Sequence, residues 1–402
     1  MPPHMTTPPR QADVAADGGN PGSIRAPFGV SWTHRLEFTN RALDAGNTIL
    51  HDVIGEENSR TGDRGLLVVV DKGVSRGNPD LLEELQGYFG AHDDLPELRE
   101  IIEADGGEQC KNHGGVVESV LKGIDTNRIC RKSTVLVIGG GAMLDAAGYA
   151  AATAHRGVRL IRMPSTVLSQ CDSGVGVKNG INHFNKKNFL GTFAPPTAVV
   201  CDLHLLKSLD DEEWHCGLSE IVKIALLKDP KLFETIEANL DGIRNRMDDP
   251  SHGIIERSAK LHLRHITEGG DPFELTEARP LDFGHWSAHK LEQMTGFELR
   301  HGEAVAIGVA LDMTYSGLVG IVDEGLVRRT LSMLEALGLP TSHAALQRTD
   351  ELTEGIEEFR EHLGGDLTIS LVRDVGEPVD VHEIDQPKLR KAVELLLERS
   401  SG

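Results

Sequence analysis

The sequence has few cysteines, no long apolar run and no excess of positive charge. Its cysteines are scattered and odd in number, and no pair has the spacing of metal ligands, which predicts free thiols in a reducing, cytoplasmic setting. These are Cys110, Cys130, Cys171, Cys201 and Cys216. No apolar stretch approaches the ~20 residues that span a bilayer. The net charge of −21 argues against a nucleic-acid or membrane-surface partner, because both need a basic face.

An anionic small molecule remains compatible with this charge. The net charge of the protein is screened beyond a Debye length of ~8 Å, so a local basic cluster can dominate a pocket. The 402 residues are 39% hydrophobic and 26% charged, which suits a sizeable core in two or three domains. Residues 1–27 are rich in Pro, Gly and Ala and lack the apolar region of a signal peptide. We therefore expect a disordered tail there.

Short β-branched runs alternate with helical patterns in the first half of the chain, at 65–73, 133–154, 158–166 and 197–203. Continuous apolar strands between helices predict a parallel α/β sheet that is covered on both faces. Beyond residue 205 the periodicity is helical, apart from a strand-like run at 365–377. The prediction is an α/β domain at 28–205, a mostly α-helical domain at 206–402, and a small-molecule site in the cleft between them.

Three glycines, Gly139, Gly140 and Gly141, follow a buried strand and precede a helix in "VLVIGGGAMLD". Glycine lets a backbone approach a pyrophosphate, and a helix N-terminus offers free N–H groups. The spacing is not G-x-G-x-x-G, so a tight turn explains it equally well. Upstream, Glu108 and Lys111 lie on a glycine-containing loop and could hold ribose hydroxyls, although a solvated loop is the plainer interpretation.

The segment 163–196 is unusual for so acidic a chain. It carries Asp172, Lys178, Lys187 and Asn188 among glycines and small residues, and Asp172 is its one carboxylate. Lysines and amides on glycine-rich backbone suit a phosphate or a polyol. A basic surface loop is the alternative. We call residues 163–196 the polar segment.

Potential metal ligands occur further along the chain. Glu220 and Lys223 share one face of a helix, which is usually a plain surface ion pair. The apolar flanking residues indicate a buried helix, where a charged pair needs a functional reason. His285 and His289 also share a helix face, although such a pair is more often structural. Glu220, His285 and His301 would form a two-histidine, one-carboxylate set with an open position, as catalytic zinc requires. Asp282 and His289 would line the same pocket.

Seven motifs together resemble the sugar phosphate cyclases, the dehydroquinate-synthase-like superfamily, over about residues 65–380. They are "DGGEQCK", "GGGAMLD", "ATAHRGVRLIRMPST", "CDSGVGVKNGINHFNKKN", "GLSEIVK", "GHWSAH" and "HGEAVAIG", and they occur in the order of that family. The resemblance implies a Rossmann-like NAD-binding domain at 28–205 and a helical metal- and substrate-binding domain at 206–402. It also implies a homodimer acting on a sugar phosphate.

The same resemblance assigns roles to residues. Zinc, or cobalt in place of zinc, would be held by Glu220, His285 and His301. NAD would contact Asp71, Glu108, Lys111, Gly139, Gly140, Gly141, Asp145, Ser165 and Thr166. The substrate site would be lined by Asp172, Lys178, Lys187, Asn188, Lys223, Asp282 and His289. Arg156 would reach the substrate phosphate of a neighbouring subunit.

Three departures from dehydroquinate synthase refine this expectation. An arginine that binds its substrate's carboxylate is replaced by Ala278, with Arg279 adjacent. An asparagine is replaced by Asp282, and a lysine pair near the C-terminus is replaced by "EFREHLGGDLTI" at 358–369. The sequence thus resembles the branch that cyclises sedoheptulose 7-phosphate through transient oxidation, phosphate elimination, re-reduction and aldol closure. A metal-dependent polyol dehydrogenase and a silent sugar-phosphate-binding protein are the rival interpretations.

Overall fold

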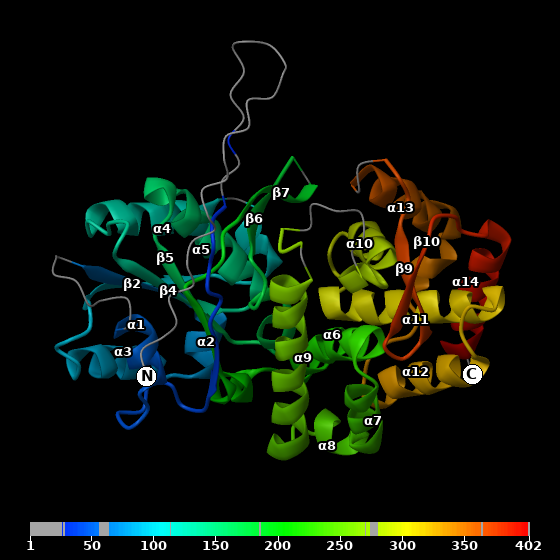
Figure 1. The fold of residues 1–402 in the computed structure, drawn as a ribbon, viewed down its shortest axis with the longest axis horizontal. Helices are drawn as coiled ribbons and strands as arrows, with labels where there is room; N and C mark the ends of the chain where they lie inside the picture. Colours follow the sequence, from blue (N-terminus) through cyan, green and yellow to red (C-terminus); the bar gives the residue numbers. More distant parts are fainter. Residues whose placement is uncertain are drawn as a thin grey trace, which may run out of the picture. The chain divides into compact units, whose positions relative to one another are not determined.

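A parallel sheet forms the first half of the fold (Figure 1). The computed structural model describes residue 26 and residues 29–55, 64–112, 114–184, 186–269, 271–273, 280–362 and 365–400. The elements below all lie in the unit 34–402, which is separate from the unit 1–33. Except for residue 26, the predicted disordered tail 1–27 lies outside the described residues.

Six parallel strands lie in the order β1-β8-β5-β4-β2-β3. The predicted runs at 65–73, 133–154, 158–166 and 197–203 form four of these strands, and β1 and β3 were not predicted. The strands are β1 (Leu36–Thr39), β2 (Gly65–Asp71), β3 (Glu97–Ala104), β4 (Thr134–Gly139), β5 (Arg159–Pro164) and β8 (Ala198–Asp202).

Helices cover both faces of this sheet, as the continuous apolar strands predict. Leu66, Val68 and Val70 pack on one face with α1 (Ile49–Gly55) and α3 (Leu81–Gly90). Leu67 and Val69 point to the other face, against α4 (Gly115–Thr126) and α5 (Gly141–Thr153). The short helix α2 (Lys72–Gly77) follows β2 directly. Side chains that alternate along a strand reach opposite faces, so a strand buried on both sides is mainly apolar.

The strand order places a topological switch point at the carboxyl ends of β2 and β4. These two strands are neighbours, but β2 connects onward to β3 on one side and β4 to β5 on the other. Ligands of open α/β sheets bind at such a switch point. Asp71 ends β2 and Gly139 ends β4, so two residues predicted to contact a nucleotide meet there.

The polar segment is only partly a loop. After β5 it forms a short helical turn (Ser169–Ser173) and then an antiparallel hairpin of β6 (Lys178–His183) and β7 (Lys186–Phe193). This hairpin was not predicted from the sequence; its strands carry several polar residues, and each contains one glycine. As a result Lys178, Lys187 and Asn188 lie on paired strands, which fixes their spacing more firmly than a loop would.

The second half is helical, as predicted (Figure 1). Its core surrounds α11, in which every residue from Ala304 to Ser316 is buried. The strand-like run at 365–377 contains β9, and a further strand, β10, pairs with it. The elements are α6 (Asp211–Lys228), α7 (Pro230–Ala238), α8 (Leu240–Arg244), α9 (Asp248–Glu268), α10 (His285–Met294), α11 (His301–Val319), α12 (Glu324–Ala336), α13 (Thr349–His362), β9 (Ile369–Asp374), β10 (Glu377–Val381) and α14 (Gln386–Ser400).

The α/β sheet followed by a helical part confirms the predicted fold class. The domain limits at residues 28, 205 and 402 stay a prediction. Among the described residues, no helix is both long and apolar enough to cross a bilayer.

Candidate functional site

The loop formed by Gly139, Gly140 and Gly141 packs against the start of the polar segment. The amide of Ser165 donates to the carbonyl oxygen of Gly139 at 3.0 Å. A Cβ atom on Gly140 would lie 3.3 Å from Cγ2 of Thr166, and one on Gly141 would lie 2.5 Å from Oγ of Ser173. A side chain at Gly141 would therefore push the two segments apart. Helix α5 begins here without a side-chain cap, so its first N–H groups suit an anion.

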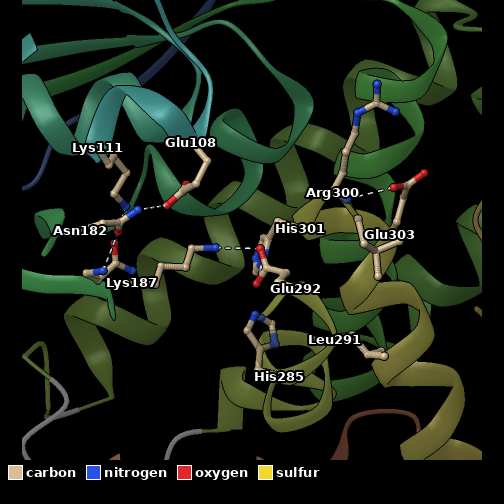
Figure 2. Close-up of polar contacts among 12 residues, drawn as sticks. Glu108, Lys111, Asn182, Lys187, His285, Leu291, Glu292, Arg300, His301 and Glu303 are labelled. Atoms are coloured by element: carbon tan, nitrogen blue, oxygen red, sulfur yellow. Dashed lines mark hydrogen bonds and ion pairs between the residues drawn. The ribbon is translucent and has the colours of Figure 1, made fainter. Parts of the chain in front are cut away.

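The loop at 105–111 is tied into the same region, against the alternative of a solvated loop. Lys111 is 2% exposed. Its Nζ atom lies 2.9 Å from Oδ2 of Asp145 and also donates to the side chain of Asn188. Oε1 of Glu108 accepts from Asn182 at 2.9 Å (Figure 2).

Asp71 lies beside this loop, because a Cβ atom on Gly106 would fall 1.8 Å from its Oδ2 atom. The side chain of Asp71 also caps helix α2 by accepting from the amide of Gly73 at 2.8 Å. Burial raises the pKa of Asp71 above its ordinary value. The residues predicted to contact NAD therefore gather at the carboxyl edge of the sheet.

The three predicted metal ligands converge from three helices. Glu220 lies within α6, His285 begins α10, and His301 begins α11. One ligand atom from each lies within 4.8 Å of the other two. Oε1 of Glu220 lies 3.5 Å from Nε2 of His285 and 3.5 Å from Nε2 of His301. Ligands at 2.0–2.1 Å around a tetrahedral zinc would be about 3.3 Å apart, close to these separations.

Hydrogen bonding at this cluster supports a cation between the three side chains. Nδ1 of His285 lies 3.1 Å from the carbonyl oxygen of Phe283, which can only accept, so Nδ1 carries the hydrogen. In a neutral ring, Nε2 then presents a lone pair toward Glu220. Oε1 of Glu220 is buried and accepts no hydrogen bond from the described residues. A lone pair facing a buried carboxylate is repulsive, and a divalent metal would relieve this repulsion.

A second group of three, His289, Glu292 and His301, also has ligand atoms within 4.8 Å of one another. Its carboxylate already has partners. Oε1 of Glu292 lies 2.8 Å from Nζ of Lys187, and Oε2 lies 3.3 Å from Nδ1 of His301 (Figure 2). The side chain of His289 is exposed. The orphaned oxygen of Glu220 therefore makes the first group the better metal site, and Glu292 a residue that holds His301.

Close helix packing explains why the ligands meet. A Cβ atom on Gly302 would lie 2.2 Å from the carbonyl oxygen of Cys216, so only glycine lets α11 approach α6 directly after His301. Gly284, with φ of 76°, precedes His285 in left-handed backbone. Its amide donates to Oδ2 of Asp312 at 2.9 Å, and the indole of Trp286 donates to Oδ1 at 2.9 Å. Burial raises the pKa of Asp312 to about 7.

Charged groups surround Glu220 on its other side. Nζ of Lys223 lies 2.5 Å from Oε2 of Glu220, and both side chains are buried. Burial alone would lower the pKa of Lys223, but Glu220 and Asp172 outweigh it and raise the pKa. Burial and Glu220 would raise the pKa of Asp172, but Lys223 and His262 hold it below its usual value. Asp172 and His262 lie in contact, with Oδ1 2.9 Å from Nδ1.

Some predicted residues have a looser connection to the cluster. Asp282 is half-buried in the turn Pro280–Asp282, and its charge helps to raise the pKa of Lys223. Lys178 and Asn188 are exposed on the hairpin. Arg156 lies in the turn after α5 with φ of 64°, and no interaction connects it to the cluster within the described part of the chain. Ala278 and Arg279 lie outside the described residues.

Four residues of this region were missed from the sequence: Arg162, Asn182, His262 and Glu292. Glu292 follows His285 and His289 on the same helix face, so its spacing was a usable signal. The others gave no such signal, because their partners are distant in the sequence. Asn182, for example, donates to Glu108 and Asn112, and its Oδ1 accepts from the amide of Asn188.

Arg162 anchors the turn between Asp172 and Lys178. Its fully buried guanidinium donates to the carbonyl oxygens of Gly174, Gly176 and Lys178 at 2.8–3.1 Å and to Oδ1 of Asn179 at 2.7 Å. Burial lowers its pKa to about 10, which leaves it charged at neutral pH. It therefore replaces water for several backbone oxygens inside the protein.

Replacing Arg162 by methionine should cost about 3 kcal/mol or more of unfolding free energy, because each buried carbonyl left without a donor costs about 1–3 kcal/mol. Arg162→Lys should cost less, since an ammonium supplies three donors. Urea unfolding measures both. Arg131→Met, at an exposed position, is the control and should change stability by under about 0.5 kcal/mol. An Arg162→Met cost below about 1 kcal/mol would show that the anchor is unimportant.

Comparison with known proteins gives one consistent family. The 3-dehydroquinate synthase N-terminal model matches residues 101–216, and the C-terminal model matches 217–361. A 3-dehydroquinate synthase from Halorhodospira halophila is 36% identical over 65% of this chain and 73% of its own length. A 2-epi-5-epi-valiolone synthase from Streptomyces glaucescens is 31% identical over 90% of this chain and 89% of its own length.

A solved structure agrees with these relatives. ValA, a 2-epi-5-epi-valiolone synthase from Streptomyces hygroscopicus subsp. jinggangensis 5008 with NAD+ and Zn2+ bound, superposes with a TM-score of 0.83. It is 27% identical, and the match covers 93% of this chain and 99% of that chain. The chain therefore belongs to the 3-dehydroquinate synthase family, as a sugar phosphate cyclase.

Proposed function

We propose that this chain cyclises sedoheptulose 7-phosphate to 2-epi-5-epi-valiolone, a seven-carbon cyclitol used in secondary metabolism. The secondary alcohol on carbon 5 is first oxidised, which acidifies the proton on carbon 6. Loss of that proton expels inorganic phosphate from carbon 7, and the carbon 5 ketone is then reduced back. An aldol step of the opened sugar closes the carbocycle. The series of reactions has no net redox change.

The connection between Lys187, Glu292 and His301 carries this proposal. It places a lysine of the polar segment beside a group of potential metal ligands, through contacts of 2.8 and 3.3 Å. Burial alone would lower the pKa of Lys187, but Glu292 outweighs it and raises the pKa, so Lys187 is a cation at neutral pH. A cation there would stabilise a leaving phosphate, which simple hydride transfer to a polyol does not require.

Preference for a sugar phosphate over a keto acid is supported by Asp282. A carboxylate accepts hydrogen bonds from hydroxyl groups but repels a substrate carboxylate. The alternatives, in order, are 2-epi-valiolone synthase, 3-dehydroquinate synthase and a metal-dependent polyol dehydrogenase.

We further propose that the chain binds NAD and Zn2+, with Co2+ as a substitute. When bound, NAD+ would accept and return one hydride, and the metal would make a substrate hydroxyl more acidic. Glu220, His285 and His301 would hold the metal. Asp71, Glu108, Lys111, Asp145, Ser165 and Thr166 would surround the cofactor, with its pyrophosphate at Gly139–Gly141.

The remaining residues would bind the sugar phosphate and move protons. Lys178, Lys187 and Asn188 would hold the phosphate, joined by Arg156 of a neighbouring subunit in a homodimer. Asp172 would accept hydrogen bonds from substrate hydroxyls. Lys223 and His289 would transfer protons near carbon 5 and during the aldol step. We place the enzyme in the cytoplasm, in keeping with five free thiols.

One incubation tests the proposal. The protein is supplied with sedoheptulose 7-phosphate, NAD+ and Zn2+, and phosphate release, NADH absorbance and the product's NMR spectrum are followed. We expect stoichiometric phosphate and 2-epi-5-epi-valiolone, with NADH never exceeding the enzyme concentration. NADH in excess over enzyme would indicate a polyol dehydrogenase, and the other isomer would indicate 2-epi-valiolone synthase. No turnover would indicate a binding protein. Light scattering tests the homodimer.

A further inference from the structure

Glu292 is a buried carboxylate that connects three separate parts of the chain. It lies on α10 and is 3% exposed. Its Oε1 atom lies 2.8 Å from Nζ of Lys187 on β7, and its Oε2 atom lies 3.3 Å from Nδ1 of His301, the first residue of α11. Figure 2 shows the Lys187 side chain extending toward Glu292.

On the histidine side, the contact determines which ring nitrogen is available. A carboxylate that accepts from Nδ1–H keeps the hydrogen on that nitrogen, so Nε2 presents its lone pair. Nε2 of His301 is the atom that faces Glu220, at 3.5 Å. Glu292 therefore holds His301 in the tautomer and orientation that a metal ligand needs.

On the lysine side, the contact fixes an ammonium group at one place. Each oxygen of the Glu292 carboxylate therefore has a nitrogen donor beside it. Lys187 uses one N–H toward Glu292 and keeps two further donors. Its side chain is 22% exposed, so the surrounding residues do not enclose it fully.

We propose that Glu292 is a positioning residue that sets the metal ligand His301 and the phosphate-binding Lys187 in one fixed arrangement. The metal half of this proposal stands on the geometry alone, and the phosphate half rests on the proposed function. An ordinary structural ion pair would involve Lys187 and Glu292 only. Glu292 also contacts His301, and this second contact predicts that Glu292 affects metal binding.

The first test measures metal binding without substrate. Metal is removed with a chelator, and Co2+ is titrated while visible absorption is followed, with Zn2+ measured by chelator competition. Loss of a carboxylate that supports a metal-bound histidine typically weakens metal affinity about 10–100-fold, and we expect this range for Glu292→Gln. Glu237→Gln is the matched control, because Glu237 pairs with Arg329 between α7 and α12. We expect the control to remain within about twofold of wild type.

Wild-type metal affinity in Glu292→Gln would overturn the proposal. If Glu292→Gln does not fold by circular dichroism, Glu292→Asp keeps the charge but shortens the side chain. We then expect affinity about tenfold weaker than wild type. Wild-type affinity in a folded Glu292→Asp would overturn the proposal equally.

The second test asks whether Glu292 and Lys187 act as one unit. At saturating metal, Lys187→Met and Glu292→Gln should each raise the KM for sedoheptulose 7-phosphate about tenfold or more. The double variant should be no worse than the poorer single variant within about threefold, because both changes remove the same arrangement. Multiplicative effects in the double variant would overturn the coupling. If wild type does not turn over this sugar phosphate, the proposed function fails, and the metal titration still decides the role of Glu292.

Discussion

Replacing His301 by alanine should remove the divalent metal and abolish turnover together. A metal can lower the pKa of bound water from about 15.7 to about 7, roughly 12 kcal/mol, which no lysine in the site could match. We expect kcat to fall by at least about 10⁴-fold, equivalent to about 5 kcal/mol of lost transition-state stabilisation. Metal content after dialysis and the rate of phosphate release are the two measurements.

A control and an independent readout separate this effect from unfolding. His252→Ala changes a histidine on α9 that pairs only weakly with Asp248, at 3.7 Å, and it should keep both metal and rate. Wild type should gain about 2.7 kcal/mol of stability at a metal concentration 100 times the Kd. His301→Ala should show no such gain. Full activity in a metal-free His301→Ala protein would refute the ligand assignment.

Much of the fold was predictable because its signals are local. The strands β2, β4 and β8 are mainly apolar, since both faces of the sheet are covered, and β5 departs from this at Arg159 and Arg162. The strand β3 was missed for a physical reason. Its apolar residues Leu98, Ile101 and Ile102 have helical spacing, and as an edge strand it is only partly buried. The strand β1 has four residues, too few for a pattern.

The candidate site was predictable to the extent that its residues lie in motifs. The pair Glu220 and Lys223, and the histidines of "GHWSAH", could be placed on helix faces from their spacing. The partners of Arg162, His262 and Glu292 could not, because those contacts depend on how distant elements pack. Lys187 and Glu292 are 105 residues apart, and the hairpin that brings Lys187 close was not visible in the sequence.

Replacing Asp282 by asparagine should shift substrate preference toward a keto acid. Wild type should prefer sedoheptulose 7-phosphate over the heptulosonate phosphate of dehydroquinate synthases. Asp282 lies three residues before His285 and close enough to Lys223 to raise its pKa. Two carboxylates ~4 Å apart repel by about 1 kcal/mol in water and about 4 kcal/mol at an effective dielectric of 20. Four kcal/mol is nearly three decades in kcat/KM.

A direct competition between the two substrates measures this preference. We expect Asp282→Asn to change the ratio of the two kcat/KM values by about 10²–10³-fold in favour of the keto acid. Glu383→Gln removes one negative charge at an exposed position and should leave the ratio unchanged. Comparable turnover of the keto acid by wild type would show that Arg279 takes the place of the arginine lost at Ala278. In that case 3-dehydroquinate synthase becomes the better assignment, because a cation beside the ring would then outweigh the charge of Asp282.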